Sequence, residues 1–174
     1  MKREKIIQAF ESYVSNYDLK DPNTNLKYIH TYKVAENCEN IARSLGLSDE
    51  EIFFAWKSGM LHDIGRFEQL KRFHTFNDAI SIDHAQFGAD LLFQEGLLEA
   101  FGEEDQTELL ETVIRCHSLY RLPEHLSDRE VMFCNILRDA DKVDIYRANY
   151  DTGVNVVYGA SFIFSFNLSI EEYS

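Results

Sequence analysis

Apolar residues recur at helical spacing along almost the whole chain. Ile6, Phe10 and Val14, for example, are four residues apart, which places them on one face of a helix. The 174 residues include only two prolines and eight glycines, so few residues interrupt long regular elements. A chain of this length also buries one sizeable core. We therefore expect an all-α fold, a bundle of about six helices, in a single domain that spans residues 1–174.

Capping signals mark where several of these helices begin and end. Ser48 and Ser127 each stand three residues before a glutamate, a spacing typical of the first turn of a helix. Gly46 is typical of the position just beyond a helix C-terminus, and Gly65 is expected to end another helix. Together with the apolar periodicity, these signals predict helices at about residues 2–17, 26–45, 48–65, from 83 onward, 105–117 and 127–146.

The remaining segments lack a sustained helical period. Residues 21–23 are predicted to form a turn, and residues 66–82 a loop over the functional site. Residues 152–174 are expected to form an irregular or short β-like tail outside a core of about residues 26–147. A capping box at residues 169–172 lies two positions before the C-terminus, which suggests a truncated chain.

Charge and composition exclude several classes of partner. The formal net charge of −13 disfavours nucleic-acid polymers, but not a small phosphorylated substrate beside metal ions. The N-terminus lacks a signal peptide and no stretch is long enough to span a bilayer, so we expect a cytoplasmic protein with no membrane partner. The three cysteines form no C-x-x-C pair and are expected to be reduced core residues. The aromatic run at residues 162–166 allows for a homo-oligomer, although core packing is the more common role.

An adjacent histidine and aspartate, His62 and Asp63, end an apolar stretch. Such a pair offers an imidazole nitrogen and a carboxylate oxygen to one point in space, and divalent metals accept that mixture readily. His-Asp dipeptides are common by chance, so the pair alone is weak evidence for a metal site.

Four more candidate ligands lie on the predicted inward faces of other helices. His30 is one turn before the apolar residue Val34. The other three, aligned in the same way on their own helices, are His84, His117 and Asp141. A single histidine on an apolar face is usually a core residue bonded to a backbone carbonyl. Six such residues together favour a metal site, because unpaired buried carboxylates cost free energy.

Four imidazoles and two carboxylates exceed the three or four ligands that one tetrahedral zinc ion needs. The set suits two adjacent divalent metals with open positions for water or substrate, one carboxylate being free to bridge them. Iron, manganese or another transition metal fits these ligands, and magnesium is also compatible. Affinity alone does not identify the metal, because affinities follow the same order at most sites.

The order of these residues resembles the HD-domain superfamily of metal-dependent phosphohydrolases. The resemblance covers about residues 26–147 and is carried by the segments LHDIGR at 61–66, DHAQFGA at 83–89 and LRDADK at 137–142. It implies an all-α fold with a dinuclear site. It further implies that one metal is held by His30, His62, Asp63 and Asp141, and that Asp63 bridges to a second metal held by His84 and His117.

The resemblance implies hydrolysis of a small phosphomonoester, phosphodiester or nucleotide by a metal-activated hydroxide. The predicted catalytic residues are Asp63, Arg66 and Lys142. Arg66 and Lys142 are cations beside the ligands and are able to bind phosphate oxygens. Lys71 and Arg72 are further candidates for this phosphate clamp. Asp144 shares the face of Asp141 and is expected to orient a ligand or water. Relatives that hydrolyse cyclic dinucleotides have a Gly-Tyr-Pro element, and relatives that hydrolyse alarmones have a Glu-Asp pair shortly after the His-Asp pair. This chain has neither element at the matching place.

Two other interpretations share the ligand set. Some all-α proteins with this arrangement resemble mixed-valent di-iron oxygenases that cleave C–C or C–P bonds, and four histidines with two carboxylates suit iron. The chain could also be a non-catalytic sensing domain that contains a metal. Oxygen consumption distinguishes the first of these from a hydrolase, and full metal occupancy without turnover distinguishes the second.

Overall fold

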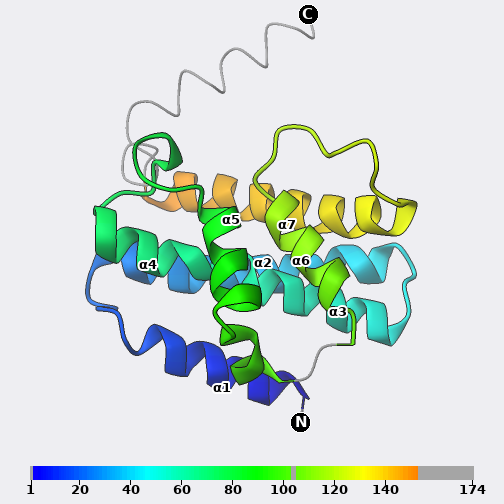
Figure 1. The fold of residues 1–174 in the computed structure, drawn as a ribbon, viewed down its shortest axis with the longest axis horizontal. Coiled ribbons are helices and arrows are strands. Elements are labelled where there is room, and N and C mark those ends of the chain that lie inside the picture. Colours follow the sequence, from blue (N-terminus) through cyan, green and yellow to red (C-terminus); the bar gives the residue numbers. More distant parts are fainter. Residues whose placement is uncertain (1, 103–104, 153–174) are drawn as a thin grey trace, which may run out of the picture.

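The computed structural model describes residues 2–102 and 105–152, and this part of the chain is all-α, as predicted (Figure 1). Short 3-10 or π segments, labelled η1 to η3, connect some of the helices. The elements are α1 (Lys2–Val14), α2 (Pro22–Ser44), α3 (Asp49–Leu61), α4 (Ile64–Phe73), η1 (Asp78–Ile80), α5 (His84–Ala89), η2 (Asp90–Gln94), η3 (Leu97–Phe101), α6 (Thr107–Cys116) and α7 (Asp128–Thr152). The predicted β-like tail lies outside the described residues.

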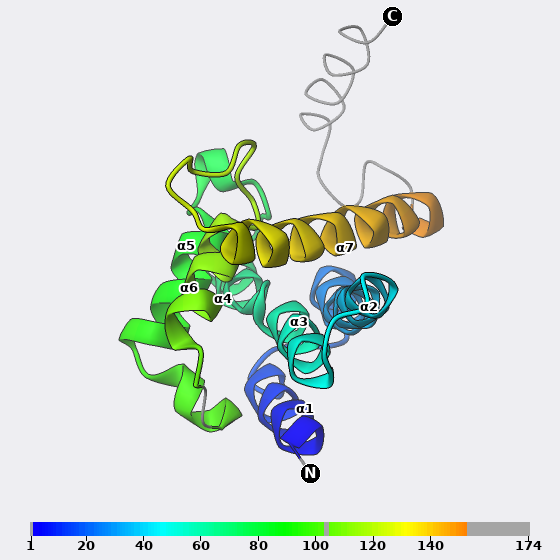
Figure 2. The same cartoon turned by 90° about the vertical axis from the view of Figure 1, so that its right-hand side faces the viewer.

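Helices α2, α3 and α7 form the frame of the molecule. Helix α2 has its most extensive contacts with α3 and α7, and Figure 2 shows α7 lying across the other two. At Gly59 the backbones of α2 and α3 come so close that a Cβ atom there would lie 2.6 Å from the Cα of Ala35. Glycine is therefore required at this contact, because any side chain would push the two helices apart.

The capping boxes predicted at Ser48 and Ser127 are confirmed. In the first, the backbone N–H of Glu51 donates to the Ser48 hydroxyl, and the backbone N–H of Ser48 donates to the Glu51 carboxylate. The prediction of a turn at residues 21–23 is wrong, because Asp21 caps α2 and Pro22 occupies its first turn. Proline suits that position, since the backbone N–H that it lacks would have no partner inside the helix.

The predicted loop at residues 66–82 is also wrong, because its first part belongs to α4. Ile64, Phe67 and Leu70 form an apolar face that is buried in the core. The ring centroid of Phe67 lies 5.9 Å from that of Phe10 on α1. The helical period was obscured in the sequence because α4 also buries two polar side chains, those of Arg66 and Gln69.

Gly65 does not end a helix, as predicted, but lies inside α4. A Cβ atom on it would lie 2.6 Å from the carbonyl oxygen of His84 and 2.8 Å from the amide nitrogen of Gly88. The glycine thus permits α4 and α5 to pack backbone against backbone. This contact sets the position of His84, the first residue of α5.

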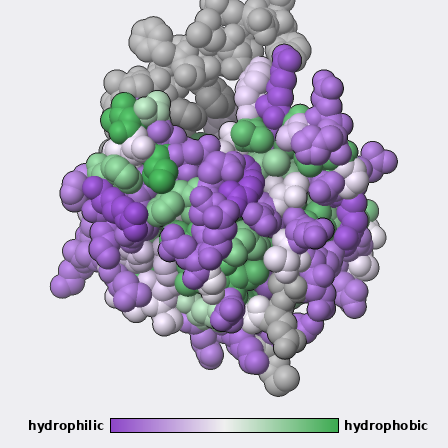
Figure 3. Space-filling view, in the orientation of Figure 1, coloured by the Kyte–Doolittle hydropathy of each residue, from purple (hydrophilic) through white to green (hydrophobic). Residues whose placement is uncertain are grey.

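The surface is largely polar on the face drawn in Figure 3, with smaller hydrophobic areas between the polar ones. None of the described helices has both the length and the apolar composition that crossing a membrane requires. The three cysteines, Cys38, Cys116 and Cys134, are buried and free, in agreement with the prediction.

Candidate metal centre

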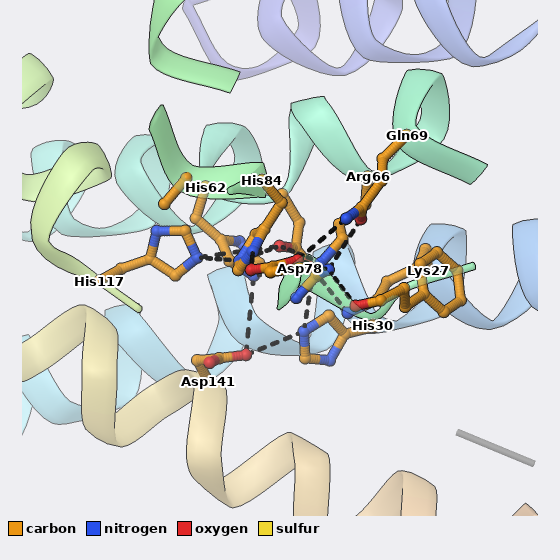
Figure 4. Close-up of polar contacts among 12 residues, drawn as sticks. Lys27, His30, His62, Arg66, Gln69, Asp78, His84, His117 and Asp141 are labelled. Atoms are coloured by element: carbon orange, nitrogen blue, oxygen red, sulfur yellow. Dashed lines mark hydrogen bonds and ion pairs between the residues drawn. The ribbon is translucent and has the colours of Figure 1, made fainter. Parts of the chain in front are cut away.

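All six predicted metal ligands meet in the interior of the protein. Figure 4 labels each of them except Asp63. His30 comes from α2, His84 begins α5, and His117 directly follows α6. Asp141 comes from α7 and is partly exposed, whereas the four histidines and Asp63 are buried. Five segments that are far apart in sequence thus deliver side chains to one point.

The helix break between α3 and α4 explains how neighbouring residues both face the centre. Helix α3 ends at Leu61 and α4 begins at Ile64. Asp63 has φ −104° and ψ 19°, outside the helical region. In an unbroken helix adjacent side chains point about 100° apart. The break allows His62 and Asp63 to share one site.

The carboxylate of Asp63 divides the centre into two halves. Its Oδ2 lies 3.5 Å from Nε2 of His30 and 3.5 Å from Nε2 of His62. Its Oδ1 lies 3.5 Å from Nε2 of His84 and 3.8 Å from Nε2 of His117. We call the set His30, His62, Asp63 and Asp141 the first half, and the set Asp63, His84 and His117 the second half.

Asp141 contributes only to the first half. Its Oδ1 lies 3.0 Å from Nε2 of His30 and 3.8 Å from Nε2 of His62. Burial would raise the pKa of Asp141, but the nearby imidazoles of His30 and His62 hold it below its usual range. The first half therefore has two carboxylates beside two imidazoles.

In each half, a carboxylate outside the ligand set holds one histidine. Nδ1 of His30 is 2.7 Å from Oδ2 of Asp144, and Nδ1 of His84 is 2.5 Å from Oδ2 of Asp78. A carboxylate only accepts hydrogen bonds, so the proton lies on Nδ1 and the lone pair of Nε2 faces the centre. This arrangement orients a metal-binding histidine and fixes its tautomer. The role predicted for Asp144 fits this contact, whereas Asp78 was not predicted.

The other histidine of each half is held by its own helix. Nδ1 of His62 donates to the carbonyl of Gly59, and Nδ1 of His117 donates to the carbonyl of Ile114. Each of these hydrogen bonds is 2.7 Å long. Burial lowers the pKa of His62 to about 3 and that of His84 to about 4, despite the carboxylates nearby. Both rings are therefore neutral near neutral pH, as metal binding requires.

His30 differs from these two histidines. Burial and the charge of Lys27 favour its neutral form, but hydrogen bonding with Asp141 and Asp144 outweighs them and raises its pKa. A metal at the first half would therefore compete with a proton for the ring of His30 more than for that of His62 or His84.

The arrangement of lone pairs fits a cation at both halves. Within the described part of the chain, the buried Nε2 atom of His62 has no hydrogen-bond partner, and Nε2 of His30 faces carboxylate oxygens of Asp141 at 3.0 Å and Asp63 at 3.5 Å. In the second half, Nε2 of His84 and Nε2 of His117 are 3.0 Å apart, with both Nδ1 protons already used elsewhere. Acceptors that face one another in a buried site are costly unless a cation lies between them.

Two cations that contact Asp63 complete the centre, and the sequence identified only one of them. The ammonium of Lys27, one turn before His30, donates to Oδ2 of Asp63 over 2.7 Å. Burial raises the pKa of Asp63, but Lys27 and the surrounding imidazoles hold it well below its usual range. On the other side, Nε of Arg66 lies 3.7 Å from Oδ1 of Asp63 and has no hydrogen-bond partner among the described residues.

A pocket of about 320 Å³ opens onto this centre. Its lining includes Asp63, Asp141, His84 and His117, and leaves out His30 and His62. It also includes four cationic side chains, those of Lys27, Arg66, Arg138 and Lys142. A larger hollow of about 490 Å³ between α1, α3 and η3 contains none of the predicted site residues.

The candidate phosphate clamp is only partly located at this pocket. Arg66 and Lys142 line it, whereas Lys71 and Arg72 do not. Lys71 and Arg72 are exposed on the outer side of α4, and Arg72 donates to the carboxylate of Glu68. Because they follow Arg66 on α4 by five and six residues, their side chains leave other sides of the helix, so their predicted role in the clamp is wrong.

Comparison with known families agrees with the geometry. The family model of the HD domain matches residues 28–146, more than half of the chain. The chain belongs to the HD domain family. HD domains are in general metal-dependent phosphohydrolases, and the match spans all six predicted ligands. No curated protein and no solved structure gives a significant match.

Proposed function

We propose that this HD-domain protein is a metal-dependent phosphohydrolase that cleaves a small phosphate ester at a two-metal centre. The observation that carries the proposal is the position of Asp63, whose two oxygens each face a different pair of imidazole nitrogens at 3.5 to 3.8 Å. A carboxylate with one oxygen toward each donor pair is suited to bridge two metals.

The two halves define which residues would hold each metal. His30, His62, Asp63 and Asp141 would hold one, and Asp63, His84 and His117 the other. Two bound divalent metals would lower the pKa of a water molecule and neutralise charge on the phosphoryl oxygens. With three protein donors, the second half has more positions available for water and substrate than the first half has.

The cations of the pocket support an anionic substrate. Four of the 17 lysine and arginine residues line this one pocket, in a chain whose net charge is −13. Nη1 of Arg66 donates to Asp78, to Gln69 and to the carbonyl of Phe76, which fixes the guanidinium in place. Its Nε remains for a phosphoryl oxygen, since it is buried and has no partner among the described residues.

Lys142 is the second predicted phosphate-binding residue. Its side chain is exposed and lines the pocket, and no residue in the described ranges forms an ion pair or hydrogen bond with it. It is therefore able to reach substrate without breaking an existing contact. We assign Arg66 and Lys142 to stabilising the charge that develops on the phosphoryl group.

The test is metal content and phosphate release, measured together for wild type and Asp63→Ala. We expect about two metals per chain and hydrolysis of p-nitrophenyl phosphate or its bis ester for wild type, and loss of both in the variant. Asp139→Ala is the matched control, because Asp139 is an exposed aspartate on α7, the helix that carries the ligand Asp141. Retained turnover in metal-replete Asp63→Ala would refute the proposal.

The same protein also tests the oxygenase alternative. Iron-loaded wild type that consumes oxygen and releases no phosphate from either ester would support that chemistry at this ligand set. Full metal occupancy with neither reaction across a broad ester panel would support the sensing domain.

A further inference from the structure

The pocket of the metal centre changes character toward its mouth. Its deep part consists of buried ligands and cations. Its outer part contains four apolar or aromatic side chains from the loop after α6 and from α7, namely Leu119, Tyr120, Ile145 and Tyr146. Tyr120 is 84% exposed and Tyr146 is 57% exposed, so both are at the solvent end of the pocket.

The outer wall is held in place by Arg138. This side chain, on α7, donates through Nη2 to the carbonyl of Leu119 at 2.9 Å and to that of Tyr120 at 3.0 Å. The bonds join the loop after α6 to α7, the helix that carries Ile145 and Tyr146. The backbone that presents Tyr120 is thereby fixed, although its ring is largely exposed, with the guanidinium carbon of Arg121 5.8 Å from the ring centroid. With the backbone already fixed, only the side-chain torsions of Tyr120 have to be ordered when a flat group binds, which reduces the entropic cost of binding.

The size of the pocket limits what binds there. Its volume of about 320 Å³ is at the lower end of the range for small-molecule sites. The deep end is suited to one phosphoryl group, and the remaining space is suited to about one ring rather than to a chain of nucleotides.

We propose that the substrate is a phosphate ester whose alcohol carries one aromatic ring, bound against Leu119, Tyr120, Ile145 and Tyr146. The inference rests on the proposed phosphohydrolase function, because it places the phosphoryl group at the metal centre. Tyr120 and Tyr146 are then specificity-determining residues, which contact the ring and take no part in the chemistry. Stacking against tyrosine favours flat rings over aliphatic chains.

The test compares two esters that differ in the ring. Benzyl phosphate and propyl phosphate are both esters of primary alcohols, so their leaving groups are similar. For the Mn²⁺-loaded protein we expect kcat/KM to be about tenfold higher for benzyl phosphate, a ratio ordinary for burying one apolar ring. Tyr120→Ala and Tyr146→Ala should each raise KM for benzyl phosphate by about threefold to tenfold and leave propyl phosphate unchanged. Tyr150→Ala is the matched control, since Tyr150 is 91% exposed on the same helix and does not line the pocket.

Binding of the non-hydrolysable benzylphosphonate and propylphosphonate is measured in parallel. A benzyl preference in binding without turnover of either ester would support the ring site and contradict the proposed hydrolysis. Turnover of both esters at equal kcat/KM would overturn the ring site and leave the hydrolase intact. A benzyl preference that survives both tyrosine variants, with unchanged thermal stability, would also overturn it.

Discussion

The two halves of the metal centre use the same donor chemistry on different frameworks. Each half has one histidine held by a carboxylate and one held by the carbonyl of its own helix. The first half is built on the long helices α2 and α7 and the end of α3, whereas the second half is built on the ends of the short helices α5 and α6. Asp63 is shared by both.

The halves differ in donor number and in access. The first half has Asp141 as an additional carboxylate, and its histidines do not line the pocket. In the second half, the nearby carboxylate of Asp78 is bound to Nδ1 of His84 and not to Nε2, and both histidines line the pocket. The two halves thus differ in the additional carboxylate of Asp141 and in which histidines line the pocket, since all four histidines are buried.

Replacing one histidine in each half tests this ranking. His84→Ala should leave about one metal per chain, because the four donors of the first half remain. His30→Ala should leave less than one, since each half then has only three donors, one of them the shared Asp63. Phosphate release should fall at least about 100-fold in both, because a two-metal reaction needs both ions. Metal content after gel filtration is the measurement, and retention of one metal by His30→Ala but none by His84→Ala would reverse the ranking.

Removing the carboxylate that holds each histidine should have a smaller effect. Asp78→Ala should weaken metal binding at the second half, and Asp144→Ala at the first, each by about 10-fold to 100-fold. Competition titration with a metal indicator measures the two affinities separately. Equal weakening of both sites by either variant would show that the halves are not independent.

Two glycines provide a comparison of the frameworks themselves. Gly65→Ala should destabilise the α4–α5 contact and Gly59→Ala the α2–α3 contact, each by about 2 kcal/mol, because the new methyl group meets backbone atoms in both. Only Gly65→Ala should also weaken the second metal. At Gly88, across the same contact as Gly65, the nearest atom is 3.1 Å from an added Cβ, so Gly88→Ala should cost less. Urea unfolding gives the free energies, and equal values for Gly65→Ala and Gly88→Ala would contradict the packing argument.

The smallest predicted effect is the loss at acid pH of the contribution of Asp78 to the free energy of unfolding. Burial raises its pKa, but hydrogen bonding to His84 and the charges of His84 and Arg66 outweigh burial and lower the pKa from 3.8 to about 2. The carboxylate of Asp78 binds a proton more readily in the unfolded chain than in the folded one. Its stabilisation of the folded protein is therefore complete above about pH 4 and is lost as the pH falls toward 2. With 33% of the side chain exposed, screening reduces the contribution to about 1 kcal/mol.

The measurement is urea unfolding of wild type and Asp78→Asn from pH 2.5 to pH 5 with a chelator present. The difference in unfolding free energy between the two should shrink by about 1 kcal/mol as the pH falls through this range. A difference that stays constant would show that Asp78 titrates alike in the folded and unfolded chain.

The first half was largely predictable because its residues follow ordinary helical periodicity. His30 continues the apolar face of Val34 and Cys38, and Asp144 follows Asp141 on one face of α7. Spacing along a long helix translates directly into direction.

The residues that hold the ligands of the second half in place were not predictable in the same way. Asp78 belongs to η1, in a segment without periodicity, and it reaches His84 only because Arg66 and Gln69 hold that segment in place. Lys27 was missed for a related reason. A lysine one turn before a ligand is usually a solvated surface residue, and only the tertiary structure buries it against Asp63.

The hydrogen bond between His30 and Asp144 joins positions 114 residues apart, whereas all donors of the second half lie between Asp63 and His117. A ribosome working from the N-terminus therefore delivers the complete donor set of the open half before α7 emerges. A nascent chain that stops before residue 128 contains all donors of the second half. It lacks Asp141 and Asp144, which belong to the first half. The donor set of the first half is thus the last to be complete, because it needs α7 to pack against the helices that precede it.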